Sequence, residues 1–303
     1  MKRVLVLIFA WLFVFGIAAL AAGDSNKLVG DVRSLDTKYS SPFNVNLEKW
    51  FADHPVEEGK MVRMETIFQT PRVMVVASAN KGQTIDLHYH TSVDEFVVPI
   101  KGQCEQYIDG KWVLMKPGDI HYNPRGVIHS TRVVGNEPFC ALSIFTPPPA
   151  GGNDRVFLNS EITTAKPGAI VGDWSLLDTQ HKKGVVFNLD EWYAKNPIEA
   201  GKTFRIDPVM GTLRSQLMIA QRPTLGVHYH GSADEIIYVY KGQGEMYING
   251  EWTKLNAGDM HFCSRGLIHG IHPADKDKEF KIFAIFAPPQ AGGSDRIFRE
   301  DLK

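Results

Sequence analysis

Short apolar runs separated by tight turns dominate the chain after its first 22 residues. Asp109-Gly110 stands between the runs 106–108 and 111–114, and Asn249-Gly250 occupies the same setting further along. Asp-Gly and Asn-Gly pairs favour the two-residue turns of β-hairpins, because both turn positions adopt positive φ. Most of the chain is therefore predicted to form short antiparallel strands.

A short helix is predicted near the start of each half. Asn46 and Asn188 have side chains suited to capping a helix N-terminus, and Pro55 and Pro197 end the two segments. The pattern as a whole predicts an all-β protein with a few short helices.

The first 22 residues form a different pattern. Lys2-Arg3 precedes an unbroken apolar run from Val4 to Ala22, which contains Ala19-Leu20-Ala21. A basic start, an apolar stretch and an A-x-A site are typical of a cleaved export signal. Residues 1–22 are thus predicted to be a signal peptide, and the protein to be periplasmic or secreted, with no stable membrane association after cleavage. An uncleaved anchor is the alternative, because the 19 residues of the run could just span a bilayer.

The chain contains an internal duplication with a period of about 140 residues. Each half closes alike, on Gly151–Phe157 and on Gly292–Phe298. A unit of this length is a domain and not a solenoid repeat. We expect the join near Thr163–Gly168, where Pro and small residues gather. The predicted domains are residues 23–165 and 166–303.

Charge and cysteine content narrow the classes of function. The 303 residues include 33 basic and 34 acidic side chains with no block of like charge, so nothing favours a nucleic-acid partner. Removing the predicted signal takes the basic count from 33 to 31 and leaves a net charge of −3. An exported protein permits a disulfide between Cys104 and Cys140, which would leave Cys263 free, and the sequence leaves this pairing open.

Two matching sets of three histidines and one glutamate are the main indication of chemical function in the sequence. With 11 His in 303 residues, a given position is His roughly once in thirty, so two in-register copies are not accidental. The candidate metal ligands are His88, His90, Glu95 and His129 in the first copy and His228, His230, Glu235 and His269 in the second.

The spacing of the four candidate ligands along the chain allows each set to meet at one place. His88 and His90 are two apart on a strand, so both face the same side. A turn-like stretch lets Glu95 begin the next strand, and His129 arrives from a third strand after a Pro-x-Gly turn. Such ligands with an open position suit a divalent transition metal, up to two per chain, with Mn, Fe(II), Co, Ni, Cu and Zn as alternatives. If the metal is taken up after export, intrinsic affinity favours Cu and Zn.

These residues match the two motifs of the cupin superfamily, G-x5-H-x-H-x(3,4)-E-x6-G and G-x5-P-x-G-x2-H-x3-N. In the first copy the motif positions are Gly82, His88, His90, Glu95, Gly102, Gly118, Pro124, Gly126 and His129, with Val133 in place of the final Asn. The second copy keeps its four ligands and departs at Arg222, Ser264 and Pro273. The chain therefore resembles a two-domain cupin, or bicupin, along nearly its whole length after residue 22.

The resemblance implies two tandem jelly-roll β-barrels, each with a metal inside. The motif arrangement is similar to that of germin-like proteins, oxalate decarboxylases and quercetinase-type, flavonol-cleaving dioxygenases. Bicupins also associate further, so a homo-oligomer is an expectation.

Two classes of function stay open. One is a metal-dependent dioxygenase or decarboxylase/lyase that acts on a small oxygen-rich substrate, such as a chelating diol, an enol or a carboxylate. The other is a non-catalytic, metal-containing protein that binds a sugar or an organic acid. Oxalate is disfavoured, because Ile85 and Leu225 stand where oxalate decarboxylases place an Arg three residues before the first His.

Four further residues are candidates for a catalytic role: His121, His261, Arg125 and Arg265. Facing inward, the two histidines would act as general bases; facing outward, they would be surface residues. The two arginines belong to the turn after the second motif's strand, where they either meet an anionic substrate at the barrel mouth or are solvated. Asn123 in one copy stands where Cys263 stands in the other, and this difference indicates unequal roles for the two sites.

Overall fold

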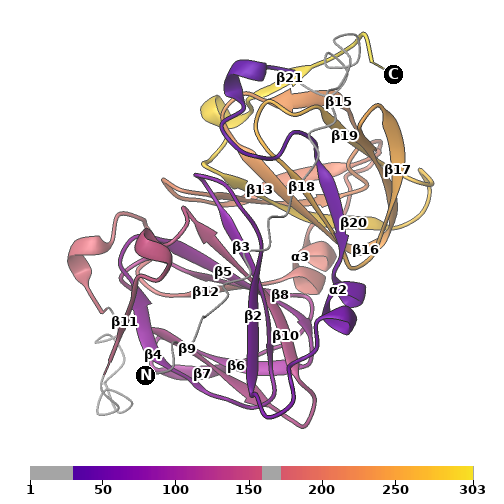
Figure 1. The fold of residues 1–303 in the computed structure, drawn as a ribbon. Helices are drawn as coiled ribbons and strands as arrows, with labels where there is room; N and C mark the ends of the chain where they lie inside the picture. Colours follow the sequence, from indigo (N-terminus) through magenta and orange to yellow (C-terminus); the bar gives the residue numbers. More distant parts are fainter. Residues whose placement is uncertain (1–29, 159–171, 303) are drawn as a thin grey trace, which may run out of the picture.

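The computed structural model describes residues 30–158 and 172–302, which fold into two β-barrels (Figure 1). The predicted signal peptide and the predicted join near 163–168 lie outside the described residues. Among the described residues, no helix combines the length and apolar character needed to cross a bilayer.

The first barrel consists of a six-stranded and a five-stranded sheet, in the orders β12-β8-β5-β10-β3-β2 and β11-β4-β9-β6-β7. Ten of these strands come from the first half of the chain: β2 (Val62–Gln69), β3 (Met74–Asn80), β4 (Ile85–His90), β5 (Asp94–Lys101), β6 (Gln103–Ile108), β7 (Lys111–Met115), β8 (Asp119–Asn123), β9 (His129–Val134), β10 (Phe139–Thr146) and β11 (Arg155–Phe157).

The second barrel is one ten-stranded sheet, because a single 15-residue strand, β16, runs through the positions that β5 and β6 occupy in the first. Its strands from the second half are β13 (Arg205–Gly211), β14 (Gln216–Gln221), β15 (Leu225–His230), β16 (Asp234–Ile248), β17 (Glu251–Asn256), β18 (Asp259–Cys263), β19 (His269–Pro273), β20 (Phe280–Ala287) and β21 (Arg296–Phe298).

The predicted turns and helices are confirmed. Asp109 and Asn249 have φ of 49° and 54° in the hairpins β6–β7 and β16–β17. The helices α2 (Leu47–Asp53) and α3 (Leu189–Lys195) begin after Asn46 and Asn188, whose side chains accept hydrogen bonds from the first helical turn. The remaining helical turns are 3-10 segments: η1 (Val32–Ser34), η2 (Ala150–Gly152), η4 (Trp174–Leu176) and η5 (Ala291–Gly293).

The two halves exchange their first segments, which the sequence did not predict. Strand β1 (Phe43–Asn46) pairs with β18 of the second barrel, and β12 (Val185–Asn188) pairs with β8 of the first. We call residues 30–46 and 172–188 the exchanged arms. Figure 1 shows the indigo segment that begins at residue 30 beside the orange and yellow strands of the second barrel. Each barrel therefore contains a segment from both of the repeat units.

Glycines allow the arms to lie close to the opposite barrel. A Cβ at Gly30 would lie 2.0 Å from the ring of Tyr229, and one at Gly172 would lie 2.2 Å from the ring of Tyr89. These tyrosines stand between the two histidines of each His-x-His pair, so each arm packs directly behind the candidate ligands of the other half.

The main hydrophobic core is shared by the two halves. One cluster contains buried residues from both, and the rings of Phe68 and Phe262 have centroids 4.1 Å apart across the boundary. Because this apolar surface is buried only when the barrels are together, its burial stabilises their association.

Buried ion pairs also link the halves. Arg72 contacts the fully buried Asp234 of the other half at 2.8 Å and Asp36 at 2.6 Å. Arg265 donates to Asp36 at 2.9 Å and to the carbonyl of Ser34 at 2.8 Å. Its guanidinium therefore holds an exchanged arm, whereas the sequence left substrate contact and solvation as the alternatives for this residue.

Equivalent arginine contacts hold the other exchanged arm, residues 172–188. Arg214 contacts Asp94 and Asp178, and Arg125 donates to Asp178 at 2.7 Å and to the carbonyl of Leu176 at 2.7 Å. The alternatives for Arg125 were substrate contact or simple solvation, and the structure shows a third role, in the arm contact.

The three cysteines are all free and buried, so the disulfide between Cys104 and Cys140 that the sequence left open is not formed.

Candidate metal centres

Four buried side chains converge in the first barrel. His88 and His90 come from β4, Glu95 from β5 and His129 from β9, and each is at most 5% exposed. One ring nitrogen from each histidine lies within 4.8 Å of the others. Oε2 of Glu95 is 3.1 Å from Nε2 of His129 and 3.8 Å from Nε2 of His90. The predicted ligand set is thus assembled around a single point.

The second barrel repeats this geometry. His228 and His230 lie on β15, Glu235 on β16 and His269 on β19. The three ring nitrogens again lie within 4.8 Å of one another, and Oε2 of Glu235 is 2.8 Å from Nε2 of His269 and 3.5 Å from Nε2 of His230.

Hydrogen bonds behind the rings orient them. In the first centre, Nδ1 of His88 and of His129 lie 2.8 Å and 2.9 Å from main-chain carbonyls, and Nδ1 of His90 lies 2.6 Å from Oδ1 of Asp154. An acceptor at Nδ1 fixes the proton there and leaves the lone pair of Nε2 directed at the centre. In the second centre Asp295 holds His230 in the same way, at 2.6 Å.

Asp154 and Asp295 were missed as functional residues in the sequence. Both also accept hydrogen bonds from the serine two residues after the second histidine of the pair, Ser92 and Ser232. The signal that could have found them was visible, because an Asp-Arg dipeptide closes both copies of the repeat at the same place.

The centres fit a divalent metal ion. Nε2 of His90, His228 and His230 is buried without a hydrogen-bond partner, and such an atom costs about 1–3 kcal/mol unless a ligand satisfies it. Burial lowers the pKa of His88 to about 2. Burial opposes ionisation of Glu95, but hydrogen bonding and charge from His129 hold its pKa well below the ordinary range. In the first centre, His88 and Glu95 thus have the forms that bind metals, neutral imidazole and ionised carboxylate.

His121 and His261 are fully buried, so the alternative of surface residues is wrong. Burial lowers the pKa of each to about 3. The ring of His261 lies 6.1 Å from that of His269, and its Nδ1 contacts Asn44 of an exchanged arm at 2.8 Å. A pKa so far below neutrality makes a weak general base, and that assignment stays a prediction.

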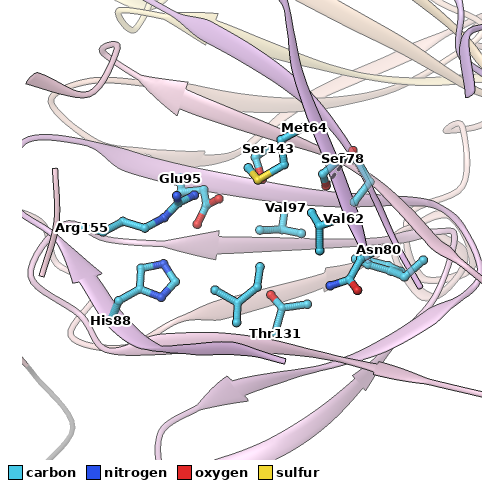
Figure 2. Close-up of a pocket in the computed structure, with 13 residues that line it drawn as sticks. Val62, Met64, Ser78, Asn80, His88, Glu95, Val97, Thr131, Ser143 and Arg155 are labelled. Carbon is cyan, nitrogen blue, oxygen red and sulfur yellow. Dashed lines mark hydrogen bonds between the residues drawn. The ribbon is translucent and has the colours of Figure 1, made fainter. Parts of the chain in front are cut away.

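A cavity adjoins the first centre. It has a volume of about 40 Å³ and is lined by His88, Glu95 and Arg155 at one end (Figure 2). Its walls mix apolar side chains with the polar groups of Ser78, Asn80, Thr131 and Ser143. This volume is far below the roughly 300–1,000 Å³ of sites that enclose drug-sized ligands, so the cavity as it stands suits a small molecule.

The second barrel is more apolar at several positions that match the lining of this cavity. Strand register matches Ser78, Thr131 and Ser143 to three apolar residues of the second barrel: Ala220, Ile271 and Ala284. All three belong to a buried hydrophobic cluster with Ile237, Phe280 and Ile282. The two centres have the same ligands but different surroundings.

A second difference lies beside the ligands. Asn123 donates to Oε2 of Glu95 at 3.5 Å, whereas Sγ of Cys263 lies 3.0 Å from Nδ1 of His269. Burial raises the pKa of the Cys263 thiol. The unequal roles expected from this pair therefore have a structural counterpart.

Comparison with known families confirms the resemblance. The Cupin domain family model matches residues 75–145 and 217–286, one stretch in each barrel. Together with the double barrel and its two ligand sets, this shows that the chain belongs to the cupin superfamily and carries two cupin domains.

Several relatives share parts of the chain. Quercetin 2,3-dioxygenase of Bacillus subtilis (strain 168) is 24% identical over 231 residues, which make up 65% of this chain and 68% of that protein. Glucose-6-phosphate isomerase of Pyrococcus furiosus is 35% identical over 74 residues, or 22% of this chain and 38% of that protein. Among solved structures, salicylate 1,2-dioxygenase of Pseudaminobacter salicylatoxidans is similar with a TM-score of 0.60 at 14% identity, covering 81% of this chain and 84% of that one. At this identity the likeness shows the fold alone.

Proposed function

We propose that the protein is a metal-dependent enzyme of the dioxygenase type that acts on a small, oxygen-rich molecule. The proposal is carried by the two buried centres, where three imidazoles and a carboxylate converge with partnerless Nε2 atoms. Two similar proteins whose names denote dioxygenases support it. A bound transition metal would supply Lewis acidity and one-electron chemistry at these ligands.

The chain's own residues set the conditions for such chemistry. Asp154 and two main-chain carbonyls fix the imidazole rings, so that the ligands need not reorganise. Burial of His90 and Glu95 excludes bulk water from one side of the centre. On the other side the cavity next to His88 gives a small molecule access to the ligands. The first barrel is accordingly the proposed place of reaction.

The proposal includes export and a structural role for the second centre. The apolar run 4–22 with its A-x-A site supports a periplasmic or secreted protein. The apolar residues at the matching positions of the second barrel support a centre that stabilises the fold. The metal stays one of Mn, Fe, Co, Ni, Cu or Zn, and a homo-oligomer stays a prediction.

Oxygen uptake tests the proposal. Protein loaded separately with each of these metals is mixed with catechol, salicylate, a flavonol and small hydroxy acids, and dissolved oxygen is followed with an electrode. We expect uptake with at least one pair, its loss with chelator, and its loss in His90→Ala. A protein that binds metal and is stabilised by one of these compounds, yet consumes no oxygen with any, would be the binding protein instead.

A further inference from the structure

We propose that Arg155 binds a carboxylate group of the substrate inside the first barrel. This inference rests on the proposed function, since it assigns the substrate class of the same site. It adds a residue that neither the cupin motifs nor the candidate ligands include.

Arg155 enters the cavity from β11, directly after Asp154. Its side chain lines the same cavity as His88 and Glu95, and Figure 2 shows it reaching toward Glu95 with His88 close by. Nε of Arg155 is buried without a hydrogen-bond partner. Within residues 30–158 and 172–302, no ion pair or side-chain hydrogen bond holds its guanidinium.

A buried guanidinium nitrogen without a partner is costly. A neutral buried donor left unpaired costs about 1–3 kcal/mol, and a charged group costs more. Such a group in a native protein calls for an explanation, and a ligand is one. The planar guanidinium fork matches a carboxylate, which accepts two parallel hydrogen bonds from it.

The charge of the cavity favours an anion. Glu95 is the one acidic side chain among the residues that line this cavity, and its charge would be directed at the metal. A bound divalent ion and Arg155 together would carry more positive charge than Glu95 and the neighbouring Asp154 carry negative charge, so the loaded site would have an excess of positive charge. In a buried setting of low dielectric constant, an anionic ligand relieves that excess.

The remaining lining selects for a small molecule with further oxygen atoms. Ser78 and Ser143 offer neutral hydroxyl groups along the walls, whereas Asn80 and Thr131 already bond to Gln83 and Gln106. The volume of about 40 Å³ limits the part of the ligand beyond the metal to a few atoms. A small hydroxy or keto acid, with its carboxylate on Arg155 and its second oxygen toward the ligand set, meets these conditions.

The second barrel provides an internal control. Arg296 follows Asp295 as Arg155 follows Asp154, and its Nε is likewise buried without a partner. However, its Nη1 lies 3.4 Å from Ser294 Oγ. The apolar Ile271 and Ala284 also stand where the first barrel has the polar Thr131 and Ser143. The proposal therefore assigns carboxylate binding to the first barrel alone.

Calorimetric titration of the metal-loaded full chain tests the assignment. The probes are glycolate and glycolamide, which share a hydroxyl and differ in charge. We expect wild type to bind one glycolate per chain and to bind glycolamide at least about tenfold more weakly. Arg155→Met should weaken glycolate by at least about tenfold and leave glycolamide unchanged, Arg155→Lys should retain part of the affinity, and Arg296→Met should match wild type.

The outcomes separate this inference from the proposed function. Metal content is measured for every variant, so a loss of glycolate binding counts only where both metals are retained. Unchanged glycolate affinity in Arg155→Met, an equal loss in Arg296→Met, or no glycolate binding by wild type overturns the carboxylate site even if oxygen uptake is found. Conversely, Arg155-dependent glycolate binding without any oxygen uptake supports the carboxylate site and contradicts the enzyme.

Discussion

Replacing Arg72 by Met tests how the two halves are held together. The Arg72 guanidinium is 12% exposed and contacts Asp234, whose side chain is fully buried, at 2.8 Å. Three other donors also bind this carboxylate: Thr70 Oγ1 at 2.7 Å, the Arg265 amide at 2.9 Å and Ser264 Oγ at 3.1 Å. The Met side chain keeps most of the buried volume and removes only the charge and its hydrogen bonds.

The expected loss of unfolding free energy in Arg72→Met follows from the burial of this ion pair. Removing one partner of a buried ion pair costs about 3–5 kcal/mol, because the remaining charge is left without compensation. Three neutral donors still serve Asp234, so we expect a value at the lower end, about 3 kcal/mol. Arg63→Met is the matched control, since Arg63 pairs with Glu65 at side-chain exposures of 25% and 38%, and such pairs contribute about 0–1 kcal/mol.

Urea unfolding measures the free energy of unfolding of Arg72→Met and of Arg63→Met. Adding Asp234→Asn to Arg72→Met should recover part of the loss, because the substitution removes the uncompensated charge. Equal destabilisation by Arg72→Met and Arg63→Met, or no recovery in the double variant, would refute the argument that a buried charge links the halves.

Three further predictions concern the centre and the arms. Asp154→Ala should weaken metal binding at the first centre about 10–100-fold in chelator competition, because it frees the ring of its histidine; unchanged affinity would contradict that role. A hydrogen bond from Arg72 lowers the pKa of Asp36. Ionised Asp36 therefore adds stability above about pH 4 that disappears as the pH falls through its folded-state pKa, and urea midpoints should fall more steeply with acid in wild type than in Asp36→Asn. Gly172→Ala would place a Cβ 2.2 Å from the Tyr89 ring and should cost about 1–3 kcal/mol, with faster proteolysis of the arm. Wild-type proteolysis rates in that variant would argue against the packing.

The convergence of the candidate ligands could be predicted from the sequence because their geometry is local. Two histidines separated by one residue face one side of a strand, and the hairpin turns at Asp109 and Asn249 fix the neighbouring strands. The duplication gave a second, independent copy of the same pattern. The meeting of these side chains and the all-β class therefore followed from short-range rules.

The exchanged arms and the more apolar interior of the second barrel could not be predicted in this way. Pairing of β1 with β18 joins residues more than two hundred positions apart, and no local pattern distinguishes it from pairing within one half. Likewise, Thr131 and Ile271 each suit a strand, and only strand register shows that they occupy the same place in the two barrels. The place of Arg155 in the cavity could not be predicted for another reason. The residue lies outside the motifs, and nothing in the sequence indicated that its side chain points into the cavity.

Metal content is the most direct test of the central claim that each barrel holds one ion. Plasma mass spectrometry of purified wild type, His90→Ala and His230→Ala should give close to two metal ions per chain in wild type and one in each variant. No stoichiometric metal in wild type, or equal content in all three proteins, would contradict the assignment of these histidines as metal ligands.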